Sequence, residues 1–387
     1  MKSNQLQRGI LFNNYSQLVF FSTNLFKSDA DLLLQTFRFI KGDECQSITS
    51  DQQIYRDTRS GKAEPTTLLK MLNDTNPEFE TLIQQLESYD IEPNEVGAWY
   101  ILMSQLIGYK ASIEKHFTDP HHSVLKYIDF LLAHCELERS FISNFSESEQ
   151  DNKTEANRII NEWLLTDKLD IFSENKSHAY EYIVSVTLYW TALFEVYMHQ
   201  EFGKARTTNT FIKSIPQLNT QGSLVRSNEI FLNNVKKYFA LKFKSKKFKW
   251  TDLSIKIAAA RVKNNLHISS NIDEVYSDNE PNQMILQKLK RWRKGYTKGN
   301  EKHLSYITMD HYKQYIAIIE NKYDKSEKDI SLFSIVLLQL WELLQFEGEK
   351  LTIPNEVIID TFAKYPKYVA LVEKRFSTFE ITGQLSP

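Results

Sequence analysis

Residues 179–202 read AYEYIVSVTLYWTALFEVYMHQEF, and the 13 residues from 182 to 194 carry no charge. A helix that spans a bilayer needs about 20 apolar residues, so this stretch is too short to cross a membrane. It is therefore predicted to be a helix buried in the core of a helical protein. Glu195 lies inside the same helix, and we expect a partner such as an arginine or a tyrosine to satisfy this buried carboxylate.

Helical periodicity dominates the rest of the chain, for example at residues 123–145, 228–242 and 331–346. The 11 Gly and 9 Pro residues make up about one residue in twenty of the 387. Ordinary usage is about one in eight, so turn-rich sandwiches and barrels are disfavoured. A single core rarely grows beyond about 250–300 residues. The predicted fold is therefore mainly α, a multi-helix bundle in two or three parts.

Composition divides the chain into four parts. The clearest boundary contains Pro216 and Gly222 in a stretch rich in Thr, Asn, Gln and Ser that has no apolar period. Residues 146–156 are polar and acidic and are expected to form a loop. The predicted parts are an acidic helical domain (1–203), a linker (204–226), a basic helical segment (227–309) and a C-terminal helical region (310–387).

Charge is distributed unevenly along the chain. Residues 236–302 hold 17 Lys and Arg but only 6 Asp and Glu, an excess of +11. The whole chain has a net charge of −2, so the remainder carries an excess of −13. A basic segment inside an acidic protein is typical of a surface that binds a polyanion, most often nucleic acid.

The first basic cluster, residues 242–250, alternates lysines with three aromatic residues. Lysines neutralise phosphates, and aromatic rings stack on exposed bases. Phe243, Phe248 and Trp250 fit either such stacking or burial in the core, and burial is slightly favoured. The lysines are expected to face solvent and to contact nucleic acid: Lys242, Lys244, Lys246, Lys247 and Lys249.

The second basic cluster, residues 283–298, is predicted to be an amphipathic helix. Ile285, Leu289 and Trp292 share one face at helical spacing, and Gly295 suits the end of the helix. Basic residues occupy most of the remaining circumference. The expected contacts to nucleic acid are Lys288, Lys290, Arg291, Arg293, Lys294 and Lys298. A solvated basic face without a ligand is the alternative.

The string LKRWRKG at residues 289–295, followed by Glu301 and Leu304, resembles the recognition-helix end of Cro-like helix-turn-helix domains. Residues 252–258 look like the preceding helix of that family. About 25 residues separate the two pieces, where the family has a short turn. The resemblance implies a core anchor at Trp292 and DNA contacts from Lys288, Arg291, Arg293 and Lys294.

A catalytic alternative centres on Arg261 and His267. Their spacing fits the loose arginine-to-histidine pattern of HEPN-type helical ribonucleases. In that family the arginine stabilises phosphate charge and the histidine transfers a proton. Val262 departs from the pattern, because a polar residue usually follows the arginine. An ordinary phosphate contact or a surface histidine is the competing interpretation.

No motif predicts a cofactor or a metal. The chain contains neither GxGxxG nor GxxxxGK[ST], and no HExxH or paired CxxC. His122 and His134 would lie about three turns apart on one helix, too far for a compact metal site. With two cysteines and a poor signal-peptide pattern, we expect a cytoplasmic protein that does not enter the membrane.

The favoured function is non-enzymatic binding of nucleic acid, with DNA ahead of RNA. Two alternatives stay open. One is the HEPN-like ribonuclease, in a defence or toxin system. The other is a helical scaffold whose basic segment docks on an acidic protein partner or on another copy of the chain.

Overall fold

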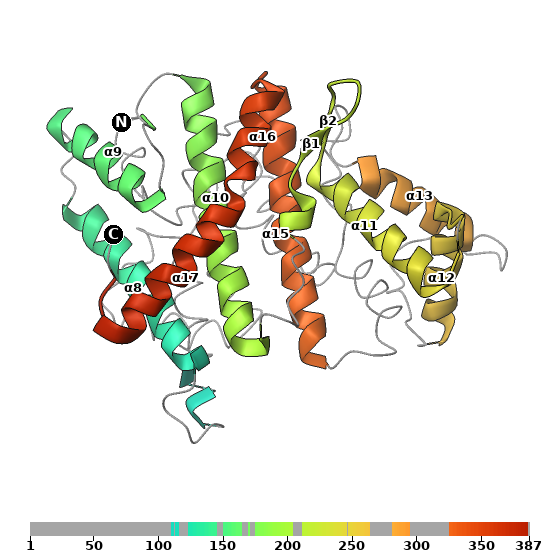
Figure 1. Cartoon of the computed structure of the whole chain (residues 1–387), viewed down its shortest axis with the longest axis horizontal. Helices are drawn as coiled ribbons and strands as arrows, with labels where there is room; N and C mark the ends of the chain where they lie inside the picture. Colours follow the sequence, from blue (N-terminus) through green and yellow to red (C-terminus); the bar gives the residue numbers. More distant parts are fainter. Residues whose placement is uncertain are drawn as a thin grey trace, which may run out of the picture. The chain divides into compact units, whose positions relative to one another are not determined.

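The computed structural model describes residues 110–111, 113–115, 123–144, 150–164, 169–170, 175–203, 211–245, 247–263, 281–294 and 325–385. These residues are almost wholly α-helical, which confirms the mainly α prediction (Figure 1). They divide into two compact units: one holds the described residues up to Gly203 and from Asp360 onward, the other those from Phe211 to Ile359. The division falls inside α16 (Asn355–Ala363). None of the described helices is long and apolar enough to cross a membrane.

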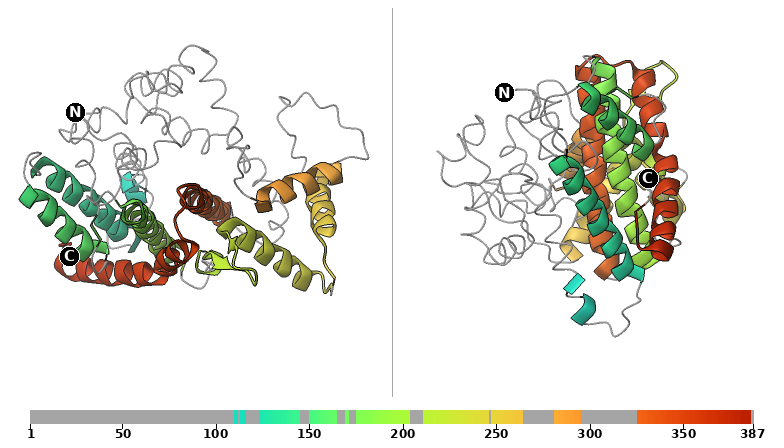
Figure 2. Two further views of the ribbon diagram at one scale, coloured as in Figure 1. Left: turned by 90° about the horizontal axis from the view of Figure 1, so that it is seen from above. Right: turned by 90° about the vertical axis from the view of Figure 1, so that its left-hand side faces the viewer.

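The first unit contains α8 (Ser123–Asn144), α9 (Gln150–Leu164), α10 (Lys176–Phe202) and α17 (Tyr365–Thr382). α10 includes the apolar stretch 179–202. It begins where the Asn175 side chain accepts the backbone N–H of Ser177 at 2.9 Å. It ends before Gly203, whose φ of 79° suits glycine. α17 crosses α10 and also packs on α8 (Figures 1 and 2).

Aromatic rings fill the core of this unit. The Phe376 ring of α17 lies 4.8 Å from Tyr127 and 5.4 Å from Phe130 of α8, measured between centroids. All three residues are buried, and so is the middle of α10. This confirms that the uncharged stretch 182–194 is a core helix. Burying large aromatic side chains supplies much of the stabilisation in such a bundle.

α9 begins earlier than expected. The predicted loop at 146–156 is wrong from residue 150 onward, because those residues are helical. Arg158 forms an ion pair with Glu155 at 2.6 Å and another with Glu162. Pairs at these helical spacings stabilise a helix whose polar composition alone reads as a loop.

The second unit contains the 3-10 turn η1 (Ile212–Ser214), a short hairpin, and the helices α11 (Ser227–Lys242), α12 (Trp250–Lys263), α13 (Pro281–Lys294) and α15 (Lys325–Lys350). In the hairpin, β1 (Gln217–Leu218) pairs antiparallel with β2 (Leu224–Val225). The Asn219 side chain accepts the backbone N–H groups of Gln221 and Ser223, at 2.8 and 2.9 Å, which closes the turn. Part of the predicted linker is therefore folded.

Side chains of α15 cap the N-terminus of α11. The Gln345 side chain accepts the Ser227 N–H at 2.9 Å and donates to the Ser227 hydroxyl at 2.6 Å. The Glu342 carboxylate accepts the Asn228 N–H at 3.2 Å. Arg226, at the N-cap position, makes no side-chain capping hydrogen bond of its own. α15 thus satisfies the free N–H groups of α11 and holds that helix in place.

These units cut across the four-part division predicted from composition. α15 and α17 both belong to the predicted region 310–387, yet they lie in different units. α15 joins the basic helices, whereas α17 joins the helices of the predicted domain 1–203. Tertiary packing between distant segments decides this arrangement, and local composition does not report it.

Candidate nucleic-acid interface

The segment that holds α11, α12 and α13 is strongly basic among the described residues, although Arg226, just before α11, pairs with Glu342 and Glu349 of α15. Among the described residues between 211 and 294 there are 16 Lys and Arg but only 2 Asp and Glu. Both acids are engaged within these helices. Glu229 lies 3.9 Å from Arg293, and Asp252 accepts the backbone N–H of Lys249 at 2.7 Å, where it caps α12.

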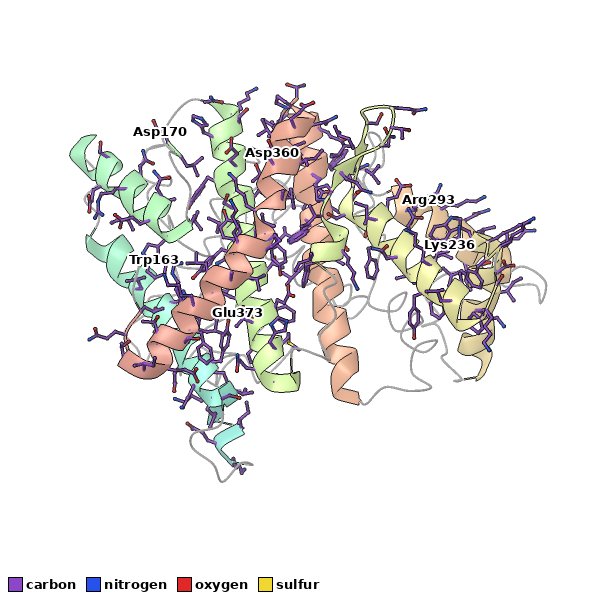
Figure 3. The ribbon with its side chains drawn as sticks, viewed as in Figure 1. Trp163, Asp170, Lys236, Arg293, Asp360 and Glu373 are labelled. Atoms are coloured by element: carbon purple, nitrogen blue, oxygen red, sulfur yellow. The ribbon has the colours of Figure 1, made fainter. Side chains whose placement is uncertain are left out.

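The three basic helices meet at Trp250, the first residue of α12. The Lys236 ammonium of α11 lies 5.2 Å from the centre of its ring, and the Arg293 guanidinium of α13 lies 5.5 Å from it. Figure 3 labels both cations. Each cation–π contact of this kind contributes about 0.5–1 kcal/mol. The contacts bring the first basic cluster, at 242–250, together with the second, at 283–298.

The chain leaves α11 through a turn that presents lysines to solvent. Lys244 adopts a left-handed conformation with φ of 51°, a position usually taken by glycine at the end of a helix. Its N–H donates to the carbonyl of Leu241 at 3.1 Å. Lys244, Lys247 and Lys249 are exposed, and no carboxylate of the described residues pairs with them.

A row of aromatic rings runs beside these lysines. Phe239, Phe243 and Phe248 stack nearly in parallel, with 6.0 Å between the centroids of each successive pair. Phe239 and Phe248 are buried, whereas Phe243 is 39% exposed. The Lys256 ammonium of α12 lies 4.6 Å from the Phe243 centroid. Burial in the core is thus confirmed for Phe248, while Phe243 reaches the surface.

The structure places some of the predicted contact residues and leaves others undescribed. Ile285 and Leu289 of α13 are buried, as the predicted apolar stripe requires, and Lys290 is exposed. Arg293 packs on Trp250 and Glu229, so part of its role is in the fold. The other predicted side chains lie outside the described residues: Lys242, Lys246, Lys288, Arg291, Trp292, Lys294 and Lys298.

The helix-turn-helix resemblance stays a prediction. α12 and α13 pack against each other, but residues 264–280, which connect them, lie outside the described residues. The ribonuclease alternative also stays a prediction. Arg261 belongs to α12, but its side chain and the whole of His267 lie outside the described part of the chain.

We compared the chain with protein-family models, with curated proteins and with solved structures. No significant match was found in any of the three comparisons.

Residues near the basic clusters also shape this surface, although the sequence did not single them out. Lys256 on α12 and Lys237 on α11 are exposed lysines. Tyr238, Leu241 and Ile255 are apolar residues that are 46%, 80% and 48% exposed. In the sequence, Lys237 and Leu241 are four residues apart, and this spacing predicts that they share one face of a helix.

The titratable side chains buried in the first unit form a separate network in its core. The Tyr365 hydroxyl donates to the Glu195 carboxylate, which confirms the expected partner for this acid. His134 Nδ1 donates to the Phe130 carbonyl at 2.9 Å, and its Nε2 accepts from the Tyr189 hydroxyl at 2.9 Å. Burial lowers the pKa of His134 to about 3, so the imidazole is neutral. This histidine is part of the packed core.

Arg375 of α17 completes that network. Its guanidinium donates to the Trp163 carbonyl at 2.9 Å and to the Tyr189 hydroxyl at 3.0 Å. It also lies 3.9 Å from the centre of the Trp163 ring. Among the described residues, no group of three or more potential metal ligands is found.

Proposed function

We propose that this protein binds nucleic acid, with DNA ahead of RNA, through exposed lysines of α11, α12 and α13 and of the turn between α11 and α12. These lysines, called the basic set below, are Lys237, Lys244, Lys247, Lys249, Lys256 and Lys290. One observation carries the proposal: 16 cationic and 2 anionic residues are described between 211 and 294. A polyanion is the ligand that such an excess of cations would attract.

The framework behind the basic set supports this proposal. Trp250 links α11, α12 and α13 through its two cation contacts, and Gln345 ties α11 to α15. Lysines on a fixed framework lose less entropy on binding than lysines on a mobile tail. Each one that neutralises a phosphate releases condensed counterions, and this release supplies the binding free energy.

DNA stands ahead of RNA because of the helix-turn-helix resemblance. In that family the second helix enters the major groove and the first crosses the backbone. By this proposal α13 would face the groove and α12 would support it, with Lys290 among the contacting residues. Arg293 would position the helix rather than read a base, because Trp250 and Glu229 already hold its guanidinium.

Fluorescence polarisation tests the proposal directly. The purified protein is titrated into labelled duplex DNA, single-stranded DNA and RNA of equal length, at about 50 and 200 mM salt. If all six lysines reach phosphates, the Kd should rise by about 10²- to 10³-fold over this range. Tighter binding of RNA than of either DNA would reverse the stated preference. Failure to bind all three at the lower salt would refute the proposal and direct attention to acidic protein partners.

A further inference from the structure

The C-terminal end of α11 exposes apolar side chains among its lysines. Tyr238 is 46% exposed, Leu241 80% and Phe243 39%, and Ile255 of the neighbouring α12 is 48% exposed. Isolated apolar residues on a surface are ordinary. A set that gathers at one place, with cations between its members, indicates a ligand that has both apolar and anionic parts.

Ring contacts show that the aromatic members of this set are contiguous. The Tyr238 ring meets the edge of Phe239 at 5.4 Å, and Phe239 stacks on Phe243 at 6.0 Å. Lys256 approaches the Phe243 ring at 4.6 Å, which brings the exposed face of α12 to the same place. Lys237 and Leu241 lie on one face of α11, four residues apart.

From this arrangement we infer that the surface at the C-terminal end of α11 binds an unpaired strand, with a base stacked on Tyr238 while neighbouring lysines hold its phosphates. This inference rests on the proposed function and adds a single-stranded ligand at this surface, apart from the groove contacts proposed for α13. Bases in a duplex are stacked on one another, so their faces are not accessible. An unpaired strand presents phosphates and free base faces together, and aromatic rings bind such faces with little regard to sequence.

Buried rings support this surface. The Phe243 ring stacks on Phe239 and Phe248, both of which are buried, and the Lys256 ammonium lies over it at 4.6 Å, so its faces are not free for a base. Tyr238 meets the edge of the buried Phe239 and is 46% exposed, so it is the ring that is open to stacking. A ring held in this way loses little conformational entropy on binding.

The test compares a strand that has bases with one that lacks them. Two labelled probes of about 12 nucleotides are titrated with the full chain: oligothymidine, and the same phosphodeoxyribose backbone made abasic throughout. We expect the oligothymidine to bind about 5- to 150-fold more tightly, the effect of stacking one base on an aromatic ring. Tyr238→Leu should reduce this ratio and leave the salt dependence unchanged, whereas Phe243→Leu should not reduce the ratio directly, because neighbouring groups already cover its ring.

Leu241→Ala is the matched control, because Leu241 is apolar and highly exposed but has no ring. It should leave the ratio unchanged. Tyr238→Leu keeps the inference testable even if Phe243→Leu fails to fold, since the Tyr238 side chain is nearly half exposed. Urea unfolding of each variant checks that the fold is intact.

The outcomes distinguish a failure of the stacking inference from a failure of the proposed nucleic-acid binding. If the unsubstituted protein binds both probes equally, with steep salt dependence, stacking is refuted and nucleic-acid binding stands. If it binds neither probe nor duplex DNA, the proposed function itself fails. If Leu241→Ala weakens binding as much as Tyr238→Leu, the surface recognises apolar groups in general, and the inference is overturned in favour of a protein or lipid partner.

Discussion

At the scale of single residues, the first unit depends on buried polar groups that satisfy one another. Glu195 is 4% exposed on the apolar helix α10, and Tyr365 donates a hydrogen bond to it from α17. Burial and the nearby carboxylate both raise the pKa of Tyr365 well above its usual value, so the phenol keeps its proton. The other carboxylate oxygen lies 3.6 Å from His199 Nε2, so the Tyr365 hydroxyl offsets part of the cost of burying this acid.

Removing the Tyr365 hydroxyl should therefore be costly. Tyr365→Phe is expected to lower the free energy of unfolding by about 1.5–3 kcal/mol, the range for hydrogen bonds to charged groups. Tyr127→Phe is the matched control, because Tyr127 is equally buried and its hydroxyl donates to a neutral acceptor, the Leu193 carbonyl. Its loss should cost about 0.5–1.5 kcal/mol. Urea unfolding measures both, and equal costs would show that Glu195 is not a charged acceptor.

The sequence predicts the type of these residues better than their partners. An acid inside an apolar helix has to be satisfied, so a tyrosine or an arginine could be expected for Glu195. That the tyrosine is Tyr365, 170 residues away, depends on how α17 packs. Similarly, His134 lies among other histidines in sequence, yet the structure places it in the core beside Tyr189.

At the scale of elements, the position of the basic helices depends on the junction between α11 and α15. Gln345 is fully buried, and its amide makes two hydrogen bonds to Ser227. The two residues are 118 positions apart, so no local pattern in the sequence reveals the pair. The helices themselves were predictable from periodicity, as 228–242 shows for α11. Their assembly was not.

Gln345→Ala should release α11 from α15. The change leaves a buried N–H and a buried hydroxyl of Ser227 unpaired, and each unsatisfied group costs about 1–3 kcal/mol. We expect a loss of about 2–4 kcal/mol in the free energy of unfolding, together with faster amide exchange at the start of α11. Gln217→Ala, at an exposed position in β1, should change stability by less than about 0.5 kcal/mol. Unchanged exchange at α11 in Gln345→Ala would contradict this role.

At the scale of the whole molecule, the two units contain buried groups whose pKa shifts act oppositely on stability. In the first unit, burial lowers the pKa of His134 from 6.5 to about 3. Between these two pKa values the unfolded chain binds a proton at this histidine, whereas the folded protein does not. This stabilisation is complete above pH 6.5 and is lost as the pH falls toward 3.

In the second unit, burial raises the pKa of Glu342 from 4.5 to about 7, against the opposing effect of Arg226 at 3.1 Å. The folded state here holds a proton that the unfolded chain releases. This contribution is complete below pH 4.5 and is lost as the pH rises through 7.

Two variants separate these effects in urea unfolding measured between pH 4 and 8. As the pH falls from about 6 to 4, His134 should lower the free energy of unfolding by roughly 1.4 kcal/mol per pH unit. His134→Gln should abolish this loss. As the pH rises from about 5 to 7, Glu342 should lower the free energy of unfolding with a similar slope, and Glu342→Gln should abolish this loss. Because other carboxylates also titrate, the slopes are compared with those of the unsubstituted protein. A slope unchanged by either substitution would contradict the shift assigned to that residue.

The charge segregation of the whole chain was visible in the sequence, because counting residues requires no fold. What the sequence did not show is that Lys236 and Arg293, 57 positions apart, share one tryptophan ring. The contact depends on how α11, α12 and α13 pack together. Partition into units was equally hidden, since α15 and α17 are separated in sequence only by α16 and belong to different units.

The measurement that tests the central claim most directly is the salt dependence of nucleic-acid binding in a charge-removal variant. The variant combines Lys244→Gly, Lys247→Ala and Lys249→Ala. Glycine at position 244 suits the left-handed backbone there, so this substitution should not destabilise the fold. The control removes three exposed lysines of the first unit, Lys176, Lys367 and Lys374, and so changes the net charge equally.

The account predicts that the slope of log Kd against log salt becomes shallower by about 2–3 in the first variant, since each lost phosphate contact contributes about 0.7–0.9. The control should keep the slope of the unsubstituted protein. Equal slopes in all three proteins would show that Lys244, Lys247 and Lys249 do not contact the nucleic acid, and would contradict the proposed interface.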